Sequence, residues 1–169
     1  LVYLCNYYGL NEVANYWENV ININDWQQER IYRNLVDKLF GTVFGKKLII
    51  LGFSFKANTN DTRESAAIQI CKDLLEEGAD LYIHDPKVSC HQIEIDLGIN
   101  HKIQNDKNKI KSKTNSEGNW FSVTNLIDAF HDVDAAIILT EWSTYKEINW
   151  HSIAKKMRKP GWIFDARSI

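Results

Sequence analysis

The sequence lacks the features that mark several common classes of protein. No run of apolar residues is long enough to span a membrane, and no signal peptide is recognisable. The net charge of −2 gives no long-range attraction to nucleic acid or to an acidic membrane surface. The histidines are scattered, with no recognisable pair of metal ligands. We therefore expect a protein without a metal site, a membrane anchor or a nucleic-acid partner.

Cysteine is also scarce. Cys5, Cys71 and Cys90 are odd in number and share neither a disulfide framework nor a metal-binding spacing. Such thiols are typical of a reduced, cytoplasmic protein. The chain has no initiator methionine and begins at Leu1 as though already inside a helix, so we expect it to be a piece of a longer protein.

A strand, a charged loop and a helix follow one another between residues 47 and 78. Residues 47–51 read KLIIL, a short apolar run that is typical of a central strand in a parallel sheet covered on both faces. A helix is predicted to begin at Ser65 and to stop at Gly78. The loop between them therefore lies at the carboxyl end of a central strand, where open α/β sheets bind their ligands.

This loop is not a dinucleotide-binding turn. Its only glycine is Gly52, so its backbone cannot approach a pyrophosphate as a G-x-G-x-x-G turn does. An anion would have to be held by the side chains of Lys56 and Arg63, together with free amides at the start of the helix. The alternative is a solvated loop in which Arg63 pairs with Asp61 or Glu64, and the residues alone leave both open.

Further strands and helices alternate along the rest of the chain. Strands are predicted at 80–84, 121–123, 134–140 and 162–165, and helices at 89–97, 125–131 (with Thr124 as its N-cap) and 150–157. This alternation predicts the α/β class, a Rossmann-like parallel sheet with helices on both faces, preceded by a long α-helix. The lysine-rich stretch 101–119 is expected to be a surface insertion.

Polar residues follow three of these strands. Arg167 is expected at the same edge of the sheet as Lys56. Glu141 would accept hydrogen bonds from a ligand and Trp142 would stack on a base, or both would cap and pack the next helix. Asp85 precedes a proline and is interpreted as a turn residue.

Residues 12–40 contain neither glycine nor proline and repeat apolar residues at helical spacing. One interpretation is a core helix that begins after an Asn11 N-cap and breaks near Asn22 or Asn24. We favour the other, a spacer between two domains that also pairs subunits. The residues expected at that interface are Trp17, Val20, Ile21 and Trp26.

Two segments of the charged loop carry a resemblance to a known family. Residues 52–56 (GFSFK) and 60–65 (NDTRES) are similar to a signature of the UDP-glucose dehydrogenases, and 82–87 (YIHDPK), 140–142 (TEW) and 164–167 (FDAR) agree with it. The chain resembles the carboxyl-terminal portion of the UDP-glucose/GDP-mannose dehydrogenase family. Residues 1–40 correspond to its central dimerisation helix and residues 41–169 to its UDP-sugar-binding domain.

The resemblance implies a function and a set of site residues. Family members oxidise UDP-glucose to UDP-glucuronate with two NAD, which is bound mainly by an amino-terminal domain. By motif, Phe55, Lys56 and Arg167 contact the substrate, Arg63 reaches NAD, and Glu141 and Trp142 border the substrate site. The family's nucleophilic cysteine lies upstream, so no catalytic residue is expected in this chain, which alone is predicted to be inactive.

Two alternatives stay open at the level of sequence. The domain would also suit another nucleotide-sugar dehydrogenase, acting on UDP-N-acetylmannosamine or GDP-mannose, because the sugar contacts lie largely upstream. It would also suit a stand-alone, non-catalytic nucleotide-binding module. The partners expected under the main hypothesis are UDP-glucose, UDP-glucuronate and a second copy of the chain.

Overall fold

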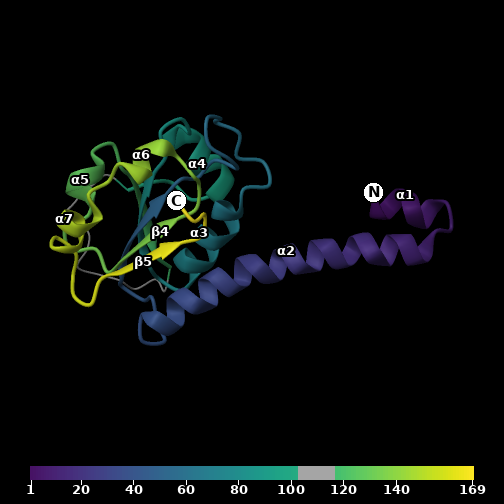
Figure 1. Cartoon of the computed structure of the whole chain (residues 1–169), viewed down its shortest axis with the longest axis horizontal. Coiled ribbons are helices and arrows are strands. Elements are labelled where there is room, and N and C mark those ends of the chain that lie inside the picture. Colours follow the sequence, from purple (N-terminus) through teal and green to yellow (C-terminus); the bar gives the residue numbers. More distant parts are fainter. Residues whose placement is uncertain (103–116) are drawn as a thin grey trace.

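A computed structural model describes residues 1–102 and 117–169 (Figure 1). The central part of the predicted insertion, residues 103–116, lies outside the described residues. The elements in chain order are α1 (Val2–Tyr7), α2 (Asn11–Lys38), β1 (Lys47–Leu51), α3 (Ala66–Glu76), β2 (Asp80–His84), α4 (Cys90–Leu97), β3 (Asn119–Ser122), α5 (Leu126–Ala129), β4 (Ala135–Ile138), α6 (Ser143–Lys146), α7 (Trp150–Ala154) and β5 (Trp162–Asp165).

The strands form one parallel sheet in the order β3-β2-β1-β4-β5. β1 lies at its centre, with Ile49 opposite Tyr82 of β2 on one side and opposite Ala136 of β4 on the other. The chain runs outward from β1 to β3 and then returns to β4, so the strand order reverses between β1 and β4. A reversal of this kind opens a crevice at the carboxyl ends of the two strands. The predicted parallel sheet is confirmed.

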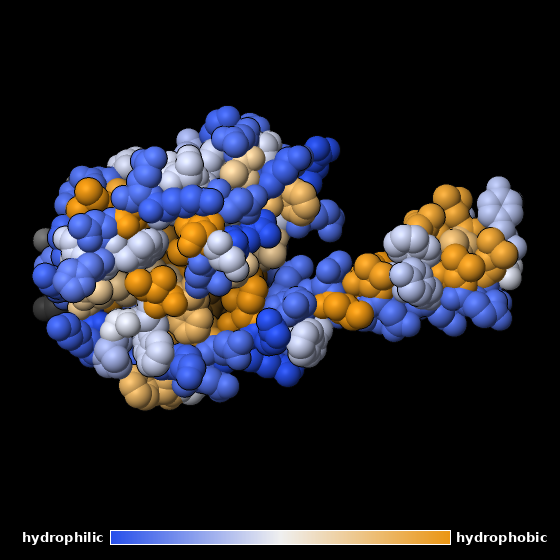
Figure 2. Space-filling model, in the orientation of Figure 1, coloured by the Kyte–Doolittle hydropathy of each residue, from blue (hydrophilic) through white to orange (hydrophobic). Residues whose placement is uncertain are grey.

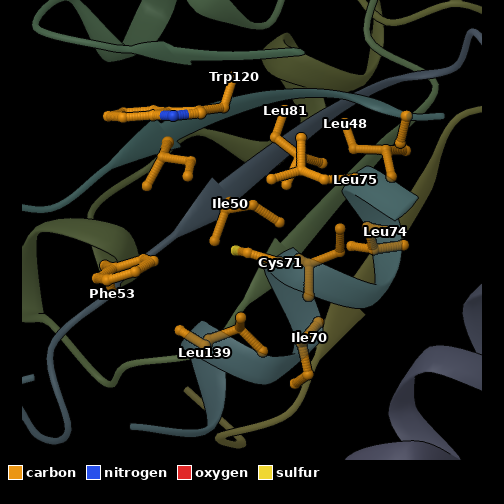
Figure 3. Close-up of a cluster of buried hydrophobic side chains, with 14 of the residues drawn as sticks. Leu48, Ile50, Phe53, Ile70, Cys71, Leu74, Leu75, Leu81, Trp120 and Leu139 are labelled. Atoms are coloured by element: carbon orange, nitrogen blue, oxygen red, sulfur yellow. The ribbon is translucent and has the colours of Figure 1, made fainter. Parts of the chain in front are cut away.

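Helices cover both faces of the sheet, as predicted. Successive side chains of a strand point to opposite faces, and in β1 Leu48 and Ile50 belong to one buried cluster while Ile49 and Leu51 belong to the other. The first cluster is closed by α3, α4 and the last turns of α2 (Figure 3). The second is closed by α5, α6 and α7. The continuous apolar run in the sequence reflects burial on both sides.

Helix α2 is a single unbroken element of 28 residues, about 42 Å long at 1.5 Å per residue. The alternative of a core helix broken near Asn22 or Asn24 is therefore wrong, and the helix is continuous, as the favoured interpretation requires. Only its last turns enter the core, through Leu35 and Leu39, while the rest extends away from the sheet and carries α1 at its far end (Figure 1).

The projecting part of α2 exposes a row of apolar side chains (Figure 2). We call this row the arm stripe, and its members are Val13, Tyr16, Trp17, Val20 and Ile21. Spacings of three and four residues place them on one side of the helix. Trp26 lies elsewhere, because it lines a groove between α2 and α3.

Several predicted element ends are corrected by the structure. Leu10, rather than Asn11, holds the N-cap position of α2 and makes no side-chain capping bond. Asn125, rather than Thr124, caps α5, because its Oδ1 accepts from the amide of Ile127 at 3.2 Å. β3 begins at Asn119, where pairing with β2 starts, and β4 and α7 are shorter than predicted. Short elements end where their neighbours stop pairing or packing, which local sequence does not encode.

The described residues contain neither a membrane-spanning helix nor a cluster of metal-binding side chains. No helix there is long and apolar enough to cross a membrane. No three histidine, cysteine or acidic side chains within ranges 1–102 and 117–169 gather closely enough to hold a metal ion.

Candidate ligand site at the switch point of the sheet

The loop after β1 turns sharply at Gly52. Its φ of +94° is unfavourable for residues with a side chain, and a Cβ here would stand 2.4 Å from Cβ of Thr140. The loops that follow β1 and β4 therefore pass in direct contact, and the Thr140 hydroxyl donates to the carbonyl of Ser54 at 2.7 Å. A glycine is required at this position to bring the two loops together.

Arg167 joins the same two loops from the end of β5. Its Nε donates to the carbonyl of Leu139 at 2.9 Å and lies 3.0 Å from Oε2 of Glu141, while its Nη2 donates to the carbonyl of Phe55 at 3.0 Å. Glu141 also approaches the amide of Ala57 at 3.5 Å. The guanidinium thus bridges the loops that follow β1 and β4, and the Arg167 side chain stays 38% exposed.

Phe55 and Lys56 lie beyond this bridge and face solvent. The ring of Phe55 is 49% exposed although the loop around it is well ordered by hydrogen bonds. Within ranges 1–102 and 117–169, the ammonium of Lys56 makes no hydrogen bond or ion pair. An apolar ring followed by an uncommitted cation suits a ligand that combines a planar or sugar surface with an anion.

Arg63 forms the ion pair that the sequence left open. Its Nε and Nη2 donate to the two carboxylate oxygens of Asp61 at 2.9 and 2.7 Å. These hydrogen bonds lower the pKa of Asp61 to about 2. The pair lies at the surface, with the Arg63 side chain 87% exposed. The guanidinium of Arg63 therefore has further N–H groups that face solvent.

Trp142 is placed by packing. It is 5% exposed, occupies the N-cap position of α6, and its ring belongs to the second buried cluster. Of the two roles left open for it, packing the first turn of the next helix is the one that this burial favours. Glu141 is 41% exposed and holds Arg167, so it borders the crevice.

Asp85 confirms its predicted turn role and does more. Its Oδ1 accepts from the amides of Lys87 and Val88, as a turn residue does, and its Oδ2 reaches back to the loop after β1. Burial raises the pKa of the Asp85 carboxyl, but four backbone amides outweigh this effect and the net pKa is lowered. Sequence reasoning missed this reach, and the only signal for it was the position of Asp85 after the strand next to β1.

The cysteines offer no activated nucleophile. Cys71 lies on α3 with its sulfur inside the first buried cluster (Figure 3), and burial raises the pKa of its thiol. Burial also raises the pKa of Cys90 at the start of α4. Cys5 is buried in α1, on the far end of α2 from the crevice. A raised pKa keeps a thiol protonated and unreactive.

Comparison with known proteins places these features in a family. Residues 49–169 match the UDP-binding domain of the UDP-glucose/GDP-mannose dehydrogenase family. The whole chain is 44% identical to UDP-glucose 6-dehydrogenase of Bos taurus and 41% identical to UDP-glucose 6-dehydrogenase 4 of Arabidopsis thaliana. It spans about a third of these curated relatives, namely 33% and 35% of their lengths.

Two solved structures share the fold. A UDP-glucose dehydrogenase from Pyrobaculum islandicum matches with a TM-score of 0.69 and 23% identity, over 97% of this chain and 31% of that one. A UDP-D-ManNAc dehydrogenase from Pyrococcus horikoshii matches with a TM-score of 0.61 and 20% identity, over 95% of this chain and 30% of that one. At these identities the likeness concerns the arrangement of the sheet and its helices.

Proposed function

This chain belongs to the UDP-glucose/GDP-mannose dehydrogenase family and carries its UDP-binding domain, and from that premise we propose that it is the carboxyl-terminal part of a UDP-glucose 6-dehydrogenase. Such an enzyme oxidises UDP-glucose to UDP-glucuronate in two NAD-dependent steps. The observation that carries the proposal is the pair of exposed residues Phe55 and Lys56 at the switch point, within a chain 44% identical to a UDP-glucose 6-dehydrogenase.

We assign the substrate contacts to three residues. Lys56 binds a phosphate or a sugar hydroxyl of UDP-glucose, because its ammonium has no partner in the described part of the chain. Phe55 packs its exposed ring against the same ligand. Arg167 positions both by holding the carbonyl of Phe55, and its exposed face adds a second cation.

The chain divides by role at about residue 40. We assign residues 1–40 to an interdomain helix region that pairs two subunits, and residues 41–169 to the UDP-sugar-binding domain. The arm stripe supports this division, since it leaves an apolar surface that the sheet domain does not cover. We place the enzyme in the cytoplasm, where its cysteines stay reduced.

Titration of the chain with UDP in a calorimeter tests the proposed function. We expect saturable binding of UDP and weaker binding of GDP, because the proposed function selects the uracil nucleotide. Uridine and inorganic phosphate, titrated separately, show how much each half of the ligand contributes. Preference for GDP would indicate a GDP-mannose dehydrogenase, and absence of binding to any nucleotide would overturn the proposal.

The chain by itself is expected to have no dehydrogenase activity. Hydride transfer needs a seated nicotinamide and the family's oxidation needs a thiolate, and the two thiols with a shifted pKa, Cys71 and Cys90, are both less acidic than free cysteine. Chain mixed with NAD and UDP-glucose should therefore produce no NADH absorbance above that of buffer. Turnover that disappears on replacing Cys90 by serine would contradict the assignment.

Replacement of Arg63 by alanine is expected to weaken the binding of NAD more than the binding of UDP-glucose in the full-length enzyme. The exposed guanidinium lies shortly before the start of α3, and we assign it to the cofactor on the other domain. Loss of one hydrogen bond to a charged group corresponds to an NAD dissociation constant raised by about tenfold. Separate titrations with NAD and UDP-glucose measure the two effects, with Arg33→Ala on α2 as the exposed-arginine control. The reverse preference would mean that Arg63 serves the substrate.

A further inference from the structure

The carboxylate of Asp85 divides its two oxygens between two loops. Oδ1 accepts from the amides of Lys87 and Val88 at 2.8 and 2.9 Å, which closes the turn after β2. Oδ1 thus acts within its own loop, and this role is the usual one for an aspartate in a turn. It does not explain the second oxygen.

Oδ2 is turned toward the loop after β1. It accepts from the amide of Phe53 at 2.8 Å and from both the amide and the hydroxyl of Ser54 at 3.0 Å. It also accepts from Nε1 of Trp142 at 3.2 Å, which belongs to the loop after β4. One oxygen atom therefore links the ends of β2, β1 and β4 at the edge of the sheet where the crevice opens.

The bonds to Oδ2 fix the base of the segment that carries the proposed ligand contacts. Phe53 and Ser54 are buried and immediately precede the exposed Phe55 and Lys56. Beyond the base, the backbone of Phe55 is held as well, because its amide donates to the carbonyl of Asp61 at 2.8 Å and its carbonyl accepts from the side chain of Arg167. The backbone at Phe53 and Ser54 leads directly into Phe55 and Lys56, so it helps to set the direction in which these two side chains project, together with the bond from Arg167 to Phe55.

A carboxylate suits this arrangement better than an amide would. The donors that converge on Asp85 come from two segments of chain and from a tryptophan, and a carboxylate offers about four acceptor sites where an amide offers about two. No Lys, Arg or His within ranges 1–102 and 117–169 pairs with Asp85 in a salt bridge, so its charge is balanced by N–H and O–H dipoles. An acidic group beside a site for an anionic ligand repels that ligand. Its presence here therefore points to a role in the structure of the loop.

We propose that Asp85 is a positioning residue of the ligand site, which acts by ordering the backbone at Phe53 and Ser54 so that Phe55 and Lys56 point into the crevice. The identity of the ligand, UDP, rests on the proposed function. The inference that Asp85 helps to order this loop rests on its contacts and does not depend on the identity of the ligand.

The variant Asp85→Asn tests this role. A side-chain amide keeps one oxygen, which is able to hold the turn at Lys87 and Val88, but it presents an NH₂ group to Phe53, Ser54 and Trp142. The N–H and O–H groups of these three residues then lose their acceptor and are left unsatisfied. We expect faster hydrogen exchange of the Phe53 and Ser54 amides, measured by NMR. We also expect the UDP dissociation constant to rise by about tenfold, which corresponds to the loss of one hydrogen bond to a charged group.

Asp134→Asn is the matched control. Asp134 is a buried carboxylate, 5% exposed, where Asp85 is half-buried, and it precedes β4 at the opposite edge of the sheet. Its Oδ2 accepts from the amide of Lys47 at 2.8 Å, and both of its oxygens lie 3.1–3.2 Å from Arg158. This variant should lower the free energy of unfolding as Asp85→Asn does, while leaving UDP affinity and the exchange of the Phe53 and Ser54 amides unchanged.

The outcomes separate this inference from the proposed function. Loss of UDP affinity and faster exchange in Asp85→Asn, with neither in Asp134→Asn, support the positioning role. Equal loss of affinity in both variants, or unchanged exchange in Asp85→Asn, overturns it. If the unsubstituted chain fails to bind UDP, the proposed function falls, and the exchange comparison still decides whether Asp85 orders the loop.

Discussion

Replacement of Lys56 by alanine is expected to raise the dissociation constant for UDP-glucose by about tenfold to a hundredfold, the range of a hydrogen bond to a charged group. Lys56 lies in the loop after β1, at the edge of the sheet where the strand order reverses. Its ammonium makes no hydrogen bond or ion pair in the described ranges, so its removal should leave the free energy of unfolding nearly unchanged. Affinity for NAD should also be unchanged, because we assign the cofactor contact to Arg63.

Lys87→Ala is the matched control for Lys56. Lys87 carries the same charge on the neighbouring loop after β2, but its Nζ donates to the carbonyl of Asn58 at 3.1 Å and is occupied within the protein. Calorimetry should therefore show little change for this variant. Similar losses in the two variants would indicate a general electrostatic attraction in place of a contact made by Lys56. Unchanged UDP-glucose binding in Lys56→Ala would remove that residue from the site.

Replacement of Val20 by glutamate is expected to convert a dimer of this chain into monomers. Val20 lies within the arm stripe and is 37% exposed. A two-fold interface contains each substitution twice. Two carboxylates would therefore be placed against apolar side chains, and they would also repel each other. Like charges in an interface cost several kcal/mol, and about 3 kcal/mol corresponds to a dimer dissociation constant raised by about a hundredfold.

Light scattering at micromolar concentration measures the mass of each variant. Asn15→Glu is the control, because Asn15 lies on the side of α2 opposite the arm stripe and is also exposed. It adds the same charge and should leave the dimer intact. A monomeric mass for the unsubstituted chain would contradict the proposed interface, and a dimer that survives Val20→Glu would place the interface elsewhere.

Much of the fold was accessible from sequence because its signals are local. The run KLIIL predicted β1 with the bounds that the structure has, since a strand buried on both faces is apolar along its buried positions, here Leu48 to Leu51. Ser65 was predicted to open α3, and its hydroxyl accepts from the amide of Ala67, as a helix cap does over a distance of two residues. The length of α2 was predicted, and its continuity past Asn22 and Asn24 agrees with the favoured of the two interpretations.

The site divides in the same way. Parallel strands end at one edge, so sequence alone determined that Lys56, Glu141 and Arg167 would lie near one another, and the family signature agreed. Sequence also determined that the chain has no glycine-rich dinucleotide turn after β1 and that its cations must supply any anion contact.

Only the tertiary structure decided which partner each of these side chains takes. The bond from Arg167 to Phe55 joins residues 112 apart in the chain, and those from Asp85 to Phe53 and Trp142 join residues 32 and 57 apart. A pattern along the chain records whether a residue is apolar, charged or able to turn. It does not record which distant donor the folded backbone brings within 3 Å of a carboxylate, because that distance is set by strand order and by the packing of both faces of the sheet.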